Sequence, residues 1–316
     1  MSRPSERAAC LLAVLLAGPS PAQEPAPRPS PTPRPLTFGA GIDVINLNVL
    51  VTDGRSRYLT DLGEKDFAIF EDGIRQELSL FTHEELPLSV ILLIDTSASM
   101  DEKIGAAQTA AVRFVKTFKP EDVGEVVQFN ERVTTLQDFT ADQGALEAAI
   151  RRTSTSGPTA MHNALYVSLK ELERHKKAGE LRRRAIVLLS DGEDTASLVK
   201  DEQVLELARS SEVCIYAISL RGDRSAQRER LAFSQAQHVL TALTRETGGQ
   251  VYFPNSLSEL DSVYERVALE LRSQYNIGYV SSNKRKDGHW RRIVIRVPTR
   301  EDVQIRHKLG YYAPAS

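Results

Sequence analysis

Five oxygen-bearing side chains stand where predicted strands end or a predicted helix begins, so one site can gather them. They are Asp95, Ser97 and Ser99 after one apolar run, Thr159 at the start of a helix, and Asp191 after a second apolar run. In an open α/β sheet, the loops at the carboxyl ends of the strands converge at one edge. Carboxylates and hydroxyls are hard donors that suit Mg²⁺ or Mn²⁺, with Ca²⁺ as an alternative, and water would complete the coordination. The sequence therefore predicts a divalent-cation site.

The hydroxyl ligands decide what such a site would do. They are neutral, so the cation would keep positive charge that a carboxylate from a partner protein can balance. Nothing nearby in the sequence places a general base against a nucleophile. We therefore expect a protein-binding module and not an enzyme. Three alternatives stay open: a metal-dependent hydrolase, a structural envelope protein with a stabilising metal, and a simple helix cap formed by Asp95 and Ser97.

Strands and helices alternate between about residues 88 and 273. The runs 88–94 and 185–189 are almost continuously apolar, as in strands that are covered on both faces. This alternation predicts an α/β fold with a doubly wound, mainly parallel sheet. Further strands are predicted at 125–129, 213–220 and 250–253, and helices at 104–118, 145–152, 159–177, 201–211, 235–247 and 256–273.

The flanks, 40–86 and 273–314, have the period-two pattern of half-buried strands. Each has about three strands, too few for a core of its own. We expect them to pack together as one β-sandwich-like domain into which the α/β domain (87–272) is inserted. The alternative is two independent β appendages.

The first residues carry a targeting signal. Arg3 and Arg7 precede the apolar run 8–18, and small residues follow at a cleavage position, which predicts a signal peptide over residues 1–22. The run is too short to span a bilayer. A proline-rich linker is predicted over 23–36. We expect a secreted or periplasmic protein without a transmembrane anchor after cleavage.

Composition adds little to this. The chain has 316 residues and a net charge of −2, which gives no electrostatic case for nucleic acid binding. Cys214 would be the lone cysteine of the mature chain. The triplet Arg182-Arg183-Arg184 is expected to be solvated. Arg221-Gly222-Asp223 matches a tripeptide that some integrins bind, and chance explains so short a match.

The site residues resemble a known motif. Asp95-x-Ser97-x-Ser99, then Thr159, then Asp191-Gly192 is similar to the metal-ion-dependent adhesion site of von Willebrand factor type A domains. The flank motifs Phe67-x-Ile69-x-Glu71-Asp72-Gly73 and Tyr275-x-Ile277-Gly278-Tyr279 resemble those of a bacterial family of exported, VWFA-related proteins. The resemblance implies that Ser97 and Ser99 bind the metal directly, Thr159 directly or through water, and both aspartates largely through water. It also implies capture of a partner's acidic residue. Ala98 replaces a frequent glycine, and Pro158 stiffens the loop before Thr159.

Overall fold

A computed structural model describes residues 44–177, 180–191, 194–220 and 227–315, and side chains outside 227–235. The predicted signal peptide, the linker and the tripeptide Arg221-Gly222-Asp223 lie outside the described residues, so these three predictions stay untested. Among the helices of the described part, none is both long enough and apolar enough to cross a bilayer.

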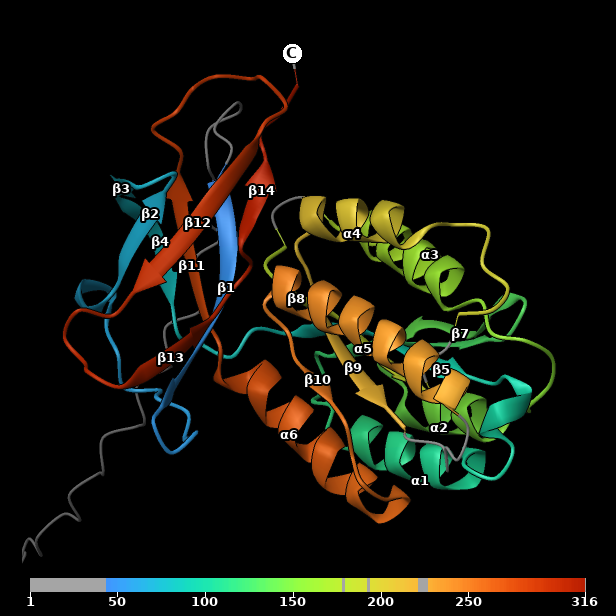
Figure 1. The fold of residues 1–316 in the computed structure, drawn as a ribbon. Helices are drawn as coiled ribbons and strands as arrows, with labels where there is room; N and C mark the ends of the chain where they lie inside the picture. Colours follow the sequence, from blue (N-terminus) through green and yellow to red (C-terminus); the bar gives the residue numbers. More distant parts are fainter. Residues whose placement is uncertain (1–43, 178–179, 192–193, 221–226, 316) are drawn as a thin grey trace, which may run out of the picture. The chain divides into compact units, whose positions relative to one another are not determined.

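A six-stranded sheet forms the centre of the α/β part, in the order β10-β9-β8-β5-β6-β7 (Figure 1). Neighbouring strands are parallel except for β7, which runs antiparallel to β6. The strands are β5 (Leu88–Asp95), β6 (Val123–Phe129), β7 (Val133–Thr140), β8 (Arg183–Ser190), β9 (Val213–Ser219) and β10 (Val251–Tyr252). The parallel pairing brings the ends of β5 and β8 to the same edge of the sheet.

Helices cover both faces of this sheet, as Figure 1 shows. Side chains along β5 alternate between two cores. Val90 and Leu92 belong to the core under α1, α2 and α6, while Ile91 and Leu93 belong to the core under α3, α4 and α5. Burial on both faces explains why the run is continuously apolar. The helices are α1 (Ile104–Val115), α2 (Gln143–Arg151), α3 (Met161–Arg174), α4 (Asp201–Ser210), α5 (Gln227–Thr247) and α6 (Leu260–Ser273), with short 3₁₀ turns at Glu64–Asp66, Ala98–Met100 and Leu257–Glu259.

The flanks form two four-stranded antiparallel sheets, in the orders β13-β1-β11-β4 and β14-β12-β2-β3. Each sheet combines strands from both ends of the chain, because β1 pairs with β11 and β2 pairs with β12. One hydrophobic core contains residues of both sheets, among them Val49, Ile69, Ile277 and Ile293. The strands are β1 (Val44–Asp53), β2 (Ala68–Glu71), β3 (Ile74–Gln76), β4 (Leu78–Thr82), β11 (Tyr275–Val280), β12 (Trp290–Arg296), β13 (Val303–Arg306) and β14 (Gly310–Tyr312).

This architecture confirms the predicted fold class: a mainly parallel α/β sheet inserted between flanks that form a sandwich-like unit. The domain boundaries themselves stay predictions. One expectation was wrong. Arg183 is not solvated but 1% exposed, and its guanidinium donates to the main-chain carbonyls of Leu271 and Gln274. Those carbonyls lie at the end of α6. The charge of Arg183 can be buried there because the carbonyls accept hydrogen bonds from its N–H groups.

Candidate metal centre

Asp95 is the last residue of β5 and is fully buried at the carboxyl edge of the sheet. The main-chain nitrogen of Ser97 donates to its Oδ1 at 2.8 Å, and the Ser190 hydroxyl donates to its Oδ2 at 2.5 Å. Burial raises the pKa of Asp95 to about 6, although the hydrogen bonds from Ser190 and Ser97 favour the ionised form. The carboxylate is therefore held in one orientation by a donor in the loop after β5 and a donor at the end of β8.

Ser97 and Ser99 connect Asp95 to the end of β8. Their hydroxyl oxygens are 3.1 Å apart, and the Ser99 hydroxyl donates to Asp191 Oδ1 at 2.9 Å. Ser97 precedes the 3₁₀ turn Ala98–Met100, but its side chain makes no capping hydrogen bond there. The hydroxyl thus faces the other oxygens and does not serve as a helix cap. Four of the five predicted residues form a continuous cluster of oxygens.

Thr159, the fifth predicted residue, lies in a neighbouring loop. That loop is bonded to the Ser97 turn, because the Ala98 nitrogen donates to the Gly157 carbonyl at 2.9 Å. The Thr159 main chain is also fixed, since its nitrogen donates to Thr195 Oγ1 at 3.0 Å and its carbonyl accepts from the Thr195 nitrogen at 2.8 Å. Among the described residues, the Thr159 hydroxyl makes no hydrogen bond to the other four side chains. Thr159 is therefore beside the cluster and not joined to it.

Lys103 belongs to the same cluster, and the sequence reasoning missed it. Its ammonium donates to Asp191 Oδ2 at 2.7 Å and to the Ser99 carbonyl at 3.1 Å. Both side chains of the ion pair are largely buried, with 16% of Lys103 and 9% of Asp191 exposed. The signal in the sequence was a lysine four residues after Ser99, at the residue that precedes α1. The Lys103 ammonium therefore already neutralises the Asp191 carboxylate, one of the two carboxylates of the cluster.

The donor set fits a hard divalent cation. It consists of carboxylate and hydroxyl oxygens, and the Lys103 ammonium shows that these oxygens attract positive charge. Within the described ranges, no group of three or more His, Cys, Asp or Glu side chains could hold a metal. Ser97 and Ser99 would offer such a cation hydroxyl oxygens, and water would complete its coordination, as Mg²⁺ and Mn²⁺ accept.

Asp194 serves a structural purpose beside the cluster. Its Oδ2 accepts from the His162 nitrogen at 2.7 Å, and its Oδ1 accepts from the Ser197 nitrogen at 3.0 Å. His162 is the second residue of α3, so the carboxylate satisfies a donor at the start of that helix. Asp194 thereby fixes the helix that begins just after Thr159.

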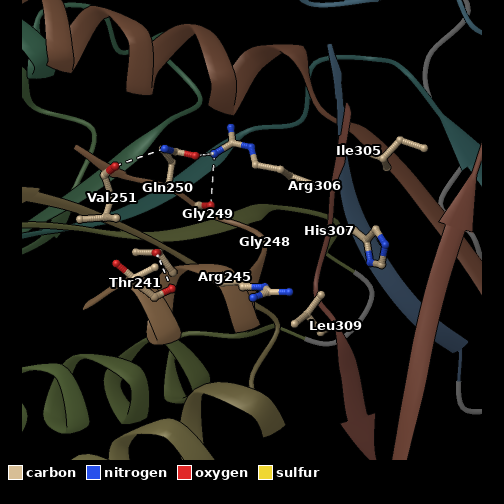
Figure 2. A pocket seen from close by; sticks show the side chains of 11 residues that line it. Thr241, Arg245, Gly248, Gly249, Gln250, Val251, Ile305, Arg306, His307 and Leu309 are labelled. Carbon is tan, nitrogen blue, oxygen red and sulfur yellow. Dashed lines mark hydrogen bonds between the residues drawn. The ribbon is translucent and has the colours of Figure 1, made fainter. Parts of the chain in front are cut away.

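Two cavities, of about 340 and 570 Å³, lie away from the oxygen cluster. Figure 2 shows the smaller one, between the end of α5 and β13. Its polar groups bond one another: Arg306 donates to Gly249 O at 3.2 Å and to Gln250 Oε1 at 2.7 Å. The His307 ring bonds to the Lys308 carbonyl and accepts from the Ile295 nitrogen. These contacts stabilise the junction of sheets and helices, and the oxygen cluster remains the candidate site.

The comparisons with known proteins concern the family and the fold. Residues 90–193 match the family model of the von Willebrand factor type A domain. This part of the chain is a von Willebrand factor type A domain. The match includes β5 from residue 90 onward, all of β8 and all five predicted site residues. A comparison with curated proteins found no match.

Two solved structures share the fold of this type A domain. A von Willebrand factor type A structure from Catenulispora acidiphila has 13% identity and a TM-score of 0.50, over 89% of this chain and 75% of that one. The second is proximal thread matrix protein 1 from the mussel byssus, with a zinc-occupied MIDAS motif (metal-ion-dependent adhesion site). It has 17% identity and a TM-score of 0.50, over 65% of this chain and 50% of that one. At this identity the likeness concerns the fold.

Proposed function

We propose that the chain is an exported protein-binding module whose type A domain binds a divalent cation through the oxygen cluster. Ser97, Ser99 and Asp191 would hold the cation, Asp95 would orient the Ser97 turn, and Thr159 would add its hydroxyl from the neighbouring loop. A bound Mg²⁺ or Mn²⁺ would supply positive charge for a carboxylate oxygen of a partner protein.

One observation carries this proposal: the hydrogen-bonded series from Ser97 through Ser99 to Asp191. It joins two loops that are far apart in the chain, and the Ser97 hydroxyl lies against the Ser99 hydroxyl while its side chain makes no capping hydrogen bond. The mussel protein has a zinc-occupied MIDAS motif on a similar fold, which is consistent with a metal at this position. Export is inferred from the predicted signal peptide.

The first test is cation binding by the mature chain, measured by isothermal titration with Mn²⁺. We expect Asp95→Ala and Ser99→Ala to abolish saturable binding. Ser258→Ala is the matched control, because Ser258 is exposed and its hydroxyl bonds to Ser256 and not to a cluster residue. Binding that survives both cluster substitutions would contradict the proposed site.

The second test concerns the partner's chemistry. A library of random peptides is selected on the immobilised mature chain in Mg²⁺, and each selected peptide is assayed again in chelator and with Asp or Glu replaced by Asn or Gln. We expect binding to need both the cation and one acidic residue of the peptide. Peptides that bind equally well in chelator, or after every acid is replaced, would argue against carboxylate capture.

A further inference from the structure

We propose that Lys103 is a built-in counter-ion that competes with the divalent cation for Asp191 and so sets the cation affinity of the site. This inference rests on the proposed function, because the cation site is the one proposed above. It goes beyond that function by assigning control of cation binding to a residue that supplies no ligand oxygen.

The position of the ammonium is the first argument. Lys103 bonds to Asp191 Oδ2 at 2.7 Å and to the Ser99 carbonyl at 3.1 Å, so it is attached to both loops of the site at once. The pair is mostly shielded from water, with 16% and 9% of the two side chains exposed. An ion pair in such surroundings is screened less than a surface pair. The ammonium is thus a component of the site and not a passing surface contact.

The division of the Asp191 carboxylate is the second argument. Oδ1 accepts from the Ser99 hydroxyl, while Oδ2 accepts from Lys103. A divalent cation among Ser97, Ser99 and Asp191 would therefore bind to a carboxylate whose charge is already neutralised. It must either displace the ammonium or tolerate a like charge a few ångströms away, and both alternatives weaken its binding.

The side chain of Lys103 suits this competition. A lysine carries a compact charge on a flexible stem, so the ammonium can leave the carboxylate for solvent without a change in the backbone. The backbone at Lys103 is itself fixed, because its nitrogen donates to the Met100 carbonyl at 2.8 Å. Without a cation, Lys103 keeps Asp191 neutralised. With a cation, the released ammonium leaves the carboxylate to the metal.

Isothermal titration of the mature chain with Mn²⁺ tests the proposal, using Lys103→Met and Lys103→Gln. Methionine removes the charge at similar length, and glutamine keeps a hydrogen-bond donor for Asp191 without the charge. We expect both variants to bind Mn²⁺ about tenfold more tightly than the wild type, which corresponds to roughly 1.4 kcal/mol. Lys116→Met is the matched control. Lys116 lies at the other end of α1, is exposed, and pairs with Glu147 of α2. Its affinity should equal that of the wild type.

Thermal unfolding gives a second readout that does not depend on a partner. In chelator, Lys103→Met should melt below the wild type because Asp191 loses its counter-ion. At saturating Mn²⁺ this difference should vanish or change sign.

The outcomes separate the two proposals. If the wild type binds Mn²⁺ and both Lys103 variants bind it with equal or lower affinity, the counter-ion role is overturned and the proposed function stays intact. Absence of Mn²⁺ binding in the wild type and in both variants would overturn both.

Discussion

The guanidinium of Arg183 donates a hydrogen bond to the main-chain carbonyl of Gln274 at 3.0 Å. It also donates to the Leu271 carbonyl and, at 3.5 Å, to Asn48 Oδ1. Leu271 lies in the last turn of α6, so the buried charge faces the carbonyl end of that helix. One side chain of β8 thereby holds the end of α6 and contacts β1 of the flanking sheet.

Replacing Arg183 with methionine should lower the free energy of unfolding by about 2–4 kcal/mol, because buried acceptors lose their donors. Equilibrium unfolding in urea measures the change. The stability of Arg183→Lys should lie between that of the wild type and that of Arg183→Met. The control is Arg113→Met. Arg113 is 64% exposed in its pair with Asp261, so its loss should change stability by less than about 1 kcal/mol. Equal effects of the two methionine substitutions would contradict the role assigned to Arg183.

Glu270 of α6 is a second link between the helix and its surroundings. Its Oε1 accepts from the Tyr252 hydroxyl at 2.8 Å and from the Tyr58 hydroxyl at 3.4 Å, and its Oε2 accepts from Arg306. We expect Tyr252→Phe to destabilise the protein by about 1–2 kcal/mol, because it removes a buried hydrogen bond to the charged Glu270 carboxylate. Tyr58→Phe should have a smaller effect because its hydrogen bond is long. Urea unfolding of both variants checks this order, and a larger effect of Tyr58→Phe than of Tyr252→Phe would contradict it.

Glu125 should make stability depend on pH. It is 2% exposed, its Oε1 accepts from the Thr135 hydroxyl, and its Oε2 has no partner among the described residues. Burial raises its pKa to about 7 from an ordinary value of 4.5. The folded state therefore favours the protonated form, so its stabilising contribution is complete below pH 4.5 and is lost as the pH rises through 7.

Glu125→Gln removes this titration, and it should raise the free energy of unfolding at pH 8 by about 1–3 kcal/mol relative to the wild type. At pH 4.5 the two proteins should be close in stability. Urea unfolding at both pH values measures the difference. A gap between the variants that does not change with pH would count against the raised pKa.

Two glycines predict opposite effects of the same substitution. A Cβ on Gly249 would lie 1.9 Å from the Ile215 carbonyl oxygen, whereas a Cβ on Gly105 would meet nothing within 4 Å. Gly249→Ala should therefore strongly lower the melting temperature, because two main-chain segments must separate. Gly105→Ala, in the first turn of α1, should leave stability unchanged or raise it by up to about 1 kcal/mol. Thermal unfolding compares the pair, and a neutral Gly249→Ala would refute the close approach.

Sequence reasoning succeeded where one physical requirement dominates. β5 and β8 are buried on both faces, and only continuous apolar runs satisfy that requirement. The joining of the two flanks followed from their inability to bury a core separately. β7 was missed because it is an edge strand without a buried residue, so its pattern carries little hydrophobic signal.

The charged residues show where such reasoning ends. Arg183 looked like one of three equivalent arginines, yet its burial depends on α6, which lies far along the chain. Lys103 was not considered because a long flexible side chain can reach many partners, and only the folded chain shows which. The four residues Asp95, Ser97, Ser99 and Asp191 were grouped correctly as neighbours, while the metal that they are predicted to bind awaits the titrations above.

The pairing of β1 affects how the chain folds during synthesis. In its sheet, β1 lies between β11 and β13, both of which come from the end of the chain. Val44 pairs with Val280, so at ribosomal speeds of about 5–20 residues per second the first strand waits roughly ten seconds or more for its neighbour. Both edges of β1 stay unpaired during that time. A chain that stops before Tyr275 would therefore carry an unpaired, aggregation-prone strand at its beginning.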